Sequence, residues 1–146
     1  MEQNIRIRCV TQVDHDFWFT LDRHLTEEAF RQKVHDRMGY VLSDDEGPCG
    51  ILRWFLFWDS IPFCSLLFIR EDRQRKGYGR VLTAHWEKAM KDLGFGLVMT
   101  STQSDEDARH FWRALGYRDT GSFDIDVPGY AQPPELIMLK DLRVER

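Results

Sequence analysis

The chain has 146 residues, of which 42% are hydrophobic and 30% charged, and its formal net charge is −4 at pH 7. This length is typical of one domain and the composition is not that of a disordered chain, so we expect a single domain over residues 1–146. The acidic balance argues against nucleic acid as the main partner, because phosphate backbones bind positive surfaces. No apolar run is long enough to span a membrane, so no membrane partner is expected.

The cysteines indicate a reducing compartment. Cys9, Cys49 and Cys64 are far apart and show no Cys-x-x-Cys spacing, which favours free thiols. The N-terminus lacks the basic and apolar regions of a signal peptide. We therefore expect a cytoplasmic protein, and because the histidines show no metal-ligand spacing, we expect no metal.

The first elements are a strand and two helices. Alternation over residues 5–9 predicts a strand, and helical spacing over residues 13–21 predicts a helix. Thr26, followed by Glu27 and Glu28, has the pattern of an N-cap. A second helix is therefore expected to run from there to about Met38.

Three strands are predicted next. Residues 40–42 and 50–58 are apolar and flank the turn-forming residues 44–47, which predicts a hairpin. The apolar run of residues 61–69 is nearly continuous, as expected of a central strand that is covered on both faces.

The remaining elements are a helix, a strand, a helix and two strands. Helical spacing begins at Gly77, a buried strand is expected over residues 97–100, and Ser104 is expected to cap the next helix. Alternation over residues 123–127 and the apolar residues 136–139 predict the last two strands. This order predicts the α/β class, with a mixed central sheet of about seven strands and about four helices.

Positive charge is concentrated between the strand over residues 61–69 and the following helix. Five basic residues fall within eleven positions there, namely Arg70, Arg73, Arg75, Lys76 and Arg80. The first turn of a helix offers free amide groups and a partial positive charge, and the glycines at 77 and 79 let an anion come close. The segment therefore predicts a phosphate site, although a solvated basic loop is the alternative when it is taken alone.

Two motifs identify a family. The segment Gln74-x-x-Gly77-x-Gly79 follows an apolar strand and opens a helix, and it resembles the signature Arg/Gln-x-x-Gly-x-Gly/Ala of the GNAT N-acetyltransferase superfamily. It lacks the Gly-Lys-Ser/Thr ending of a phosphate-loop NTPase. The run from Ala108 to Tyr117 resembles the same family's Ala-x-x-Phe-Tyr-x-x-x-Gly-Phe helix end. The resemblance extends over nearly the whole chain.

This resemblance implies a GNAT acyltransferase fold and an acetyl-CoA-dependent enzyme. The amides from Arg75 to Arg80 would hold the pyrophosphate, and the backbone of the preceding strand would pair with the pantetheine arm. The family assigns the coenzyme to the positions of Leu67, Phe68, Ile69, Gln74, Arg75, Lys76, Gly77, Tyr78, Gly79, Arg80, Asp105 and Trp112. Asp105 stands where many members have an asparagine.

The family's catalytic side chains are replaced in this chain. Trp112 occupies the position of the usual tyrosine acid, and Phe63 stands where some members place a glutamate base. His110 or Tyr117 would then substitute as the acid, unless the thiolate takes its proton from water. Asp59, in a turn between two strands, is the best acidic candidate near the acceptor, with a plain turn residue as the alternative.

The acceptor is expected to be an amine. Trp54 and Trp58 are candidates for an aromatic pocket that holds a cation, although core packing explains at least part of that strand. We expect acetyl transfer to a primary amine of a small molecule by direct attack in a ternary complex, in a monomer or homodimer. The alternatives are a protein or peptide N-acetyltransferase, a catalytically weak acyl-CoA-binding sensor, and an unrelated anion-binding domain.

Overall fold

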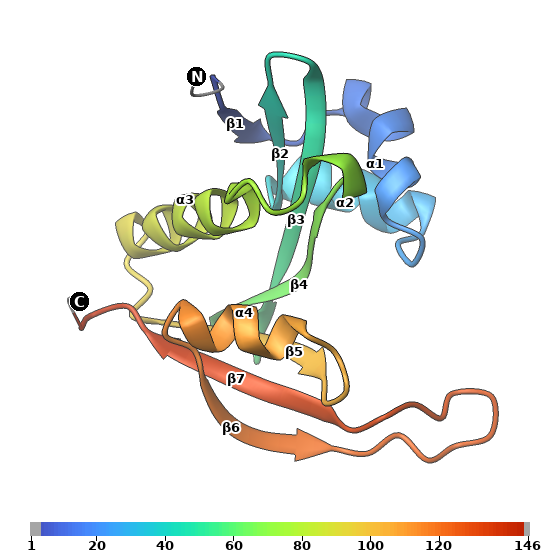
Figure 1. Cartoon of the computed structure of the whole chain (residues 1–146), viewed down its shortest axis with the longest axis vertical. Coiled ribbons are helices and arrows are strands. Elements are labelled where there is room, and N and C mark those ends of the chain that lie inside the picture. The colour runs from blue at the N-terminus through green and yellow to red at the C-terminus, as the bar shows by residue number, and fades with distance from the viewer. Residues whose placement is uncertain (1–3, 145–146) are drawn as a thin grey trace. The chain divides into compact units, whose positions relative to one another are not determined.

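A computed structural model describes residues 4–144 of the chain (Figure 1). Seven strands form one mixed sheet in the order β1-β2-β3-β4-β5-β7-β6. The pairing of β4 with β5 is parallel, whereas β1–β2, β2–β3, β5–β7 and β6–β7 are antiparallel. With four α-helices, this confirms the predicted α/β class and its mixed sheet.

The strands are β1 (Arg6–Cys9), β2 (Gly39–Asp44), β3 (Gly47–Phe57), β4 (Ile61–Ile69), β5 (Leu97–Gln103), β6 (Arg118–Phe123) and β7 (Glu135–Asp141). The α-helices are α1 (His15–Leu21), α2 (Glu27–Asp36), α3 (Tyr78–Asp92) and α4 (Ala108–Ala114), and the short 3₁₀ helices are η1 (Gln12–Asp14) and η2 (Glu71–Arg73). No helix within residues 4–144 is both long and apolar enough to cross a membrane.

The described residues form two compact units. The first contains the chain up to Phe55 together with Ser65–Ala89, and the second contains Leu56–Cys64 and the chain from Met90 onward. The chain passes between the units at β3, β4 and α3. A single domain over residues 1–146 therefore stays a prediction.

The core of the first unit lies between the sheet and helices α1 and α2. Val41 of β2 and Ile51 of β3 pack with Trp18 of α1 and Phe30 of α2, and all four side chains are fully buried. Thr26 caps α2 as predicted, because its hydroxyl accepts the N–H of Ala29 over 3.1 Å. The apolar face of these two helices is thereby fixed on the sheet.

Helix α3 covers the opposite face of the same strands. Successive residues of a strand point to opposite faces, so Tyr40 points away from the side that Val41 faces. The ring of Tyr40 lies 5.1 Å from that of His85 on α3, and Leu82 and Trp86 of α3 are fully buried. The start of α3 is therefore held against the β2–β3 hairpin.

The second unit is built on β5. Phe63 and Cys64 of β4 pair with Met99 and Thr100 of β5, and the Thr100 hydroxyl donates to the carbonyl of Cys64 over 3.0 Å. On its other side β5 pairs with β7 along its whole length, and α4 lies across these strands (Figure 1).

Two predicted elements have the wrong bounds. Ser104 does not cap a helix: its N–H donates to the carbonyl of Pro134 over 2.8 Å, and α4 begins only at Ala108, after a turn. The strand predicted over residues 123–127 is also wrong, because β6 is Arg118–Phe123 and all six of its residues are exposed. The alternation belongs to the segment after the strand.

Candidate functional site

The junction between β4 and α3 presents a row of amide groups without partners. The first backbone bond of α3 runs from the N–H of Val81 to the carbonyl of Gly77 over 3.1 Å. The N–H groups of residues 75–80 meet no acceptor within the described residues 4–144. Since the first turn of a helix also carries a partial positive charge, these amides form a site suited to an anion.

The backbone of this junction has the conformation of an anion-binding nest. Arg75 and Gly77 have φ values of 66° and 83°, whereas Lys76 between them is not among the residues of positive φ. Alternating signs of φ turn successive N–H groups toward one side. A Cβ atom added to Gly77 would meet no atom within 4 Å, so the space beside the nest is open.

Three basic side chains stand beside the nest without a protein partner. Arg75, Lys76 and Arg80 are exposed, and none of them forms an ion pair or hydrogen bond with any residue in the range 4–144. Their charges are therefore available to a ligand, as donors that strengthen the bond to a phosphate oxygen.

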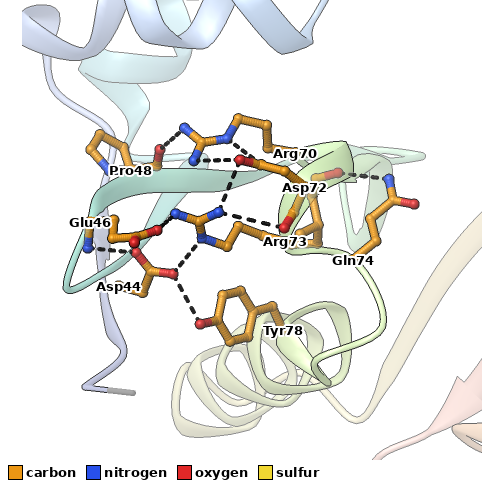
Figure 2. A network of polar contacts seen from close by, with 9 residues as sticks. Asp44, Glu46, Pro48, Arg70, Asp72, Arg73, Gln74 and Tyr78 are labelled. Carbon is orange, nitrogen blue, oxygen red and sulfur yellow. Dashed lines mark hydrogen bonds and ion pairs between the residues drawn. The ribbon is translucent and has the colours of Figure 1, made fainter.

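The other two basic residues of the segment serve the fold instead. Arg73 is only 9% exposed and pairs with Asp44, Glu46 and Asp72, while Arg70 pairs with Asp72 over 2.6 Å (Figure 2). The sequence places five basic residues in this segment and predicts Arg75, Lys76 and Arg80 as the donors to the anion. Only the three exposed ones fit that role, because the charge of Arg73 is already neutralised.

Asp44 is the centre of this network (Figure 2). Its side chain is buried at the end of β2, where Oδ2 accepts Nε of Arg73 over 2.9 Å and the hydroxyl of Tyr78 over 3.0 Å. Its Oδ1 accepts the N–H of Glu46 over 2.9 Å. Burial opposes ionisation of Asp44, but these hydrogen bonds and the charge of Arg73 outweigh it and hold the pKa of the carboxyl below its usual value.

Gln74 has a visible structural role. Its side-chain Nε2 donates to the carbonyl of Ile69, the last residue of β4, over 2.8 Å. The N–H of Arg70 donates to the carbonyl of Cys49 in β3 over 2.7 Å. The signature glutamine thus closes the turn that leads out of the strand and into the nest.

The strand that precedes the nest is tied to β3 and to the core of the first unit. Leu66 packs on the core beside Ile51, and Ser65 accepts a hydrogen bond from the side chain of Arg53 over 3.1 Å. The Ser65 hydroxyl also donates to the carbonyl of Arg53 over 3.3 Å. Phe68, further along β4, is 39% exposed.

The candidates for the acid lie in the second unit. Trp112 and Tyr117 are buried, and their rings meet edge to face at 4.9 Å. The ammonium of Lys140 lies 5.6 Å from the centre of the Tyr117 ring. His110 is exposed on α4, and Asp105 is exposed in the turn before it. The structure thus brings Tyr117 next to Trp112 and leaves His110 on the surface.

The acceptor candidates lie around the β3–β4 hairpin. Trp58 and Asp59 form its turn, with φ values of 53° and 58°, a left-handed conformation that non-glycine residues rarely adopt. The side chain of Trp58 is 78% exposed, with its ring 4.8 Å from that of Phe57. Trp54 is buried instead, and its indole N–H has no partner within the described residues. Phe63, at the position where some members of the family carry a glutamate base, is buried as well.

Sequence reasoning missed Asp44 and the role of Arg73. Asp44 was interpreted as part of a turn, yet it is the last residue of β2. One signal was present: alternation along β2 places Asp44 on the same face as Leu42 and Tyr40, and a carboxylate on a buried face needs a charged partner. Nothing in the sequence identifies that partner, because Arg73 is 29 residues away.

Comparison with known proteins gives a family match for the sequence and matches of the fold to solved structures. The sequence model described as the acetyltransferase (GNAT) family matches residues 6–117, whereas no curated protein matches significantly. The fold is similar to that of the ribosomal-protein-S18-alanine N-acetyltransferase from Escherichia coli, with a TM-score of 0.81 and 15% identity over 98% of this chain and 97% of that one.

Two further solved structures have the same fold. Spermidine/spermine N-acetyltransferase from Vibrio cholerae matches with a TM-score of 0.76 and 14% identity over 94% of this chain and 92% of that one. A GNAT family acetyltransferase from Elizabethkingia anophelis with acetyl-CoA bound matches with a TM-score of 0.74 and 15% identity over 96% and 99%. At these identities the likeness shows the fold, and the acceptor differs among the proteins that share it.

Proposed function

The chain belongs to the GNAT acetyltransferase family, and from that premise we propose that it transfers an acetyl group from acetyl-CoA to a primary amine of a small molecule. The observation that carries the proposal is the row of amides of residues 75–80 that meet no acceptor within residues 4–144. The exposed cations Arg75, Lys76 and Arg80 flank it. A diphosphate has the charge and the acceptor oxygens that such a nest requires.

The coenzyme is held chiefly by the backbone. The nest takes the pyrophosphate, since the space beside Gly77 is open, and Gly79 keeps the first turn of α3 free of a side chain. The backbone of Leu67, Phe68 and Ile69 pairs with the pantetheine arm as another strand would. Asp105 and Trp112 complete the set of positions that the family assigns to the coenzyme.

The coenzyme supplies an acetyl thioester, and the chain supplies the alignment. The unprotonated amine of the acceptor attacks the carbonyl carbon, the bond to sulfur breaks, and the amine loses its proton as the thiolate gains one. Holding the two reactants together can supply an effective molarity on the order of 10⁵ M or more. An amide near Phe68 stabilises the developing oxyanion.

The protons need groups other than the family's usual ones. The indole of Trp112 cannot supply a proton to a thiolate, so we assign the acid to Tyr117, which lies 4.9 Å from Trp112 ring to ring, or to the exposed His110. Asp59, next to the exposed ring of Trp58, attracts a cationic amine and accepts its proton. Trp54, the other acceptor candidate, is buried on β3.

Two alternatives remain as candidates with an observation behind each. A protein or peptide acceptor is supported by the fold match to an enzyme that acetylates a ribosomal protein. A catalytically weak acyl-CoA sensor is supported by Trp112, which is buried where the family has its acid. In each case we place the protein in the cytoplasm, as a monomer or homodimer.

Calorimetry with acetyl-CoA tests the proposal first. Binding with a Kd of tens of micromolar or tighter is expected, and absence of heat at that concentration would remove the enzyme and the sensor together. Thiol release from acetyl-CoA is then followed with spermidine, small aromatic amines and an Ala-initiated peptide. Turnover with a small amine supports the proposal, turnover with the peptide alone supports the protein acceptor, and binding without turnover supports the sensor.

A further inference from the structure

One carboxylate oxygen binds the side chains on either side of the nest residues 75–77. Oδ2 of Asp44 accepts Nε of Arg73 and the hydroxyl of Tyr78, and these two residues bracket positions 74–77. Between them, Arg75, Lys76 and Gly77 are exposed. The exposed residues 75–77 thus lie between Arg73 and Tyr78, whose side chains both bind Oδ2 of Asp44 (Figure 2).

The nest needs such support because its backbone is strained. Arg75 adopts a φ of 66°, which non-glycine residues occupy only where the surrounding structure enforces it. The exposed side chains of residues 75 and 76 supply no such enforcement, since they form no hydrogen bond or ion pair with the described part of the chain. The contacts that can impose this conformation lie at Arg73, Gln74 and Tyr78.

Asp44 itself is firmly placed. It is fully buried, its second oxygen accepts the N–H of Glu46 over 2.9 Å, and Glu46 also forms an ion pair with Arg73. The β2–β3 hairpin that carries it is further joined to the segment by Arg70, which donates to the carbonyls of Cys49 and Pro48. The segment with the nest is therefore joined to the β2–β3 hairpin at several points.

We propose that Asp44 is a positioning residue for the coenzyme: it acts through Arg73 and Tyr78 to hold the amides of residues 75–80 in the conformation that binds a diphosphate. The inference rests on the proposed function for the identity of the ligand. The part of the inference that concerns the conformation of residues 75–77 is independent of the proposed function. Asp44 is separated from the ligand by the side chains it holds, so removing it changes the amides and not a direct contact.

The chain offers a matched control for the variant Asp44→Asn. Asp22 is an equally buried carboxylate, which accepts Nε of Arg53 over 2.8 Å and the indole N–H of Trp18 over 3.0 Å. It belongs to the α1–α2 side of the first unit and has no contact with residues 70–80 among its hydrogen bonds. Both variants leave an arginine without its buried partner, so both should lower the Tm by a similar amount, about 10 °C.

The experiment measures binding and order separately. Calorimetry gives the Kd for acetyl-CoA, and ¹⁵N relaxation gives the order parameters of the amides of residues 75–77, both at a temperature where every variant is folded. We expect Asp44→Asn to raise the Kd about tenfold or more and to lower these order parameters from about 0.85 to below about 0.6. Asp22→Asn should leave the Kd within about twofold and the order parameters unchanged, despite its lower Tm.

A milder variant covers the case in which Asp44→Asn does not fold. Tyr78→Phe keeps the ion pair of Asp44 and removes one of the two tethers, so it should raise the Kd about threefold and increase motion at residues 75–77. The proposal would be overturned if the order parameters of residues 75–77 were unchanged in both Asp44→Asn and Tyr78→Phe. Equal effects of Asp44→Asn and Asp22→Asn on the Kd and on these order parameters would also overturn it. If the wild-type protein binds no acetyl-CoA, the proposed function fails, and the order parameters alone decide whether Asp44 positions the nest.

Discussion

The hydroxyl of Tyr78 donates to the carboxylate of Asp44 across 34 residues of sequence, and both side chains are buried. Tyr78 is the residue between the two glycines of the coenzyme signature. The signature segment is therefore bound to the β2–β3 hairpin by one of its own side chains. The bond also raises the pKa of Tyr78, which burial raises in the first place. The phenol therefore stays protonated and keeps donating.

Stability should fall in acid because of Asp44. Its pKa is lower in the folded chain than its ordinary value of 3.8, so the unfolded state binds more protons, and the contribution is present above that pH and lost as the pH falls below it. Asp44→Asn should lower the free energy of unfolding by about 3 kcal/mol at pH 7, and by less at pH 3. Urea unfolding at both pH values measures this difference.

The exposed neighbour Asp45 provides the control for that measurement. Its side chain is 61% exposed and lies 3.9 Å from Arg6, so Asp45→Asn should change the free energy of unfolding by less than about 0.5 kcal/mol. A deficit of Asp44→Asn that is as large at pH 3 as at pH 7 would show that the ion pair is not its cause.

Gly77 should be required for binding beyond its effect on stability. Gly77 and Gly94 both have positive φ, 83° and 98°, and a Cβ at either would meet no atom within 4 Å. Gly77→Ala and Gly94→Ala should therefore each destabilise the fold by about 1 kcal/mol, through backbone strain alone. Only Gly77→Ala should weaken acetyl-CoA binding, by about tenfold. Equal Kd values for the two variants in calorimetry would contradict the nest.

Lys76 should contribute affinity and no stability. Since it is exposed and has no partner within residues 4–144, Lys76→Gln should weaken acetyl-CoA binding about fivefold and leave the Tm within about 2 °C. Arg31 on α2 is equally exposed and unpaired in that range, and Arg31→Gln should change neither quantity. If both variants weaken binding alike, the effect is one of net charge and not of the nest.

The fold was predictable where burial imposes a pattern. The apolar run that became β4 and the cap at Thr26 were found because a covered strand and a helix start each have a strong local signature. β6 was misplaced because Arg118–Phe123 is an edge strand exposed along its length, and such a strand needs no apolar alternation. The start of α4 was missed because Ser104 pairs with Pro134, which lies 30 residues further along the chain.

Sequence patterns lead only to the local part of the candidate site, whose ligand stays a prediction. Glycine spacing and charge led to residues 74–80 because a nest and a helix start are formed by consecutive residues. The network that supports them joins Asp44 to Arg73 and Tyr78, 29 and 34 residues away, and no local pattern encodes that pairing. The sequence alone therefore does not show that the charge of Arg73 is neutralised within the fold.

Replacing Trp112 should reveal whether a missing acid limits turnover. Trp112 is buried and lies against Phe111 and Tyr117. Trp112→Tyr puts a phenol where the family carries its acid. Because we assign the acid to Tyr117 or His110, this variant should change kcat by less than about twofold, whereas a gain of about tenfold or more would show that a missing acid limits turnover. Phe111→Tyr, which adds a hydroxyl one residue away, should not raise it. No gain in thiol release from Trp112→Tyr would favour Tyr117 as the resident acid.

His15, the first residue of α1, should make stability depend on pH in the opposite sense. His15 bonds to Asp16 over 2.8 Å and to Glu27 over 2.7 Å, and these carboxylates raise its pKa. The contribution is present below the ordinary pKa of 6.5 and is lost as the pH rises through the folded value. The Tm of wild type should exceed that of His15→Gln by more at pH 5.5 than at pH 8.5. A constant difference would exclude the ion pairs.

The turn at Trp58 and Asp59 marks a position where stability can be gained by design. Both residues occupy the left-handed region, where an asparagine followed by a glycine is the pair that a tight hairpin favours. The double substitution Trp58→Asn with Asp59→Gly would relieve that strain and raise the free energy of unfolding. The same change removes an exposed ring and a carboxylate. Lower turnover in the more stable variant would show that these two side chains serve catalysis at the expense of stability.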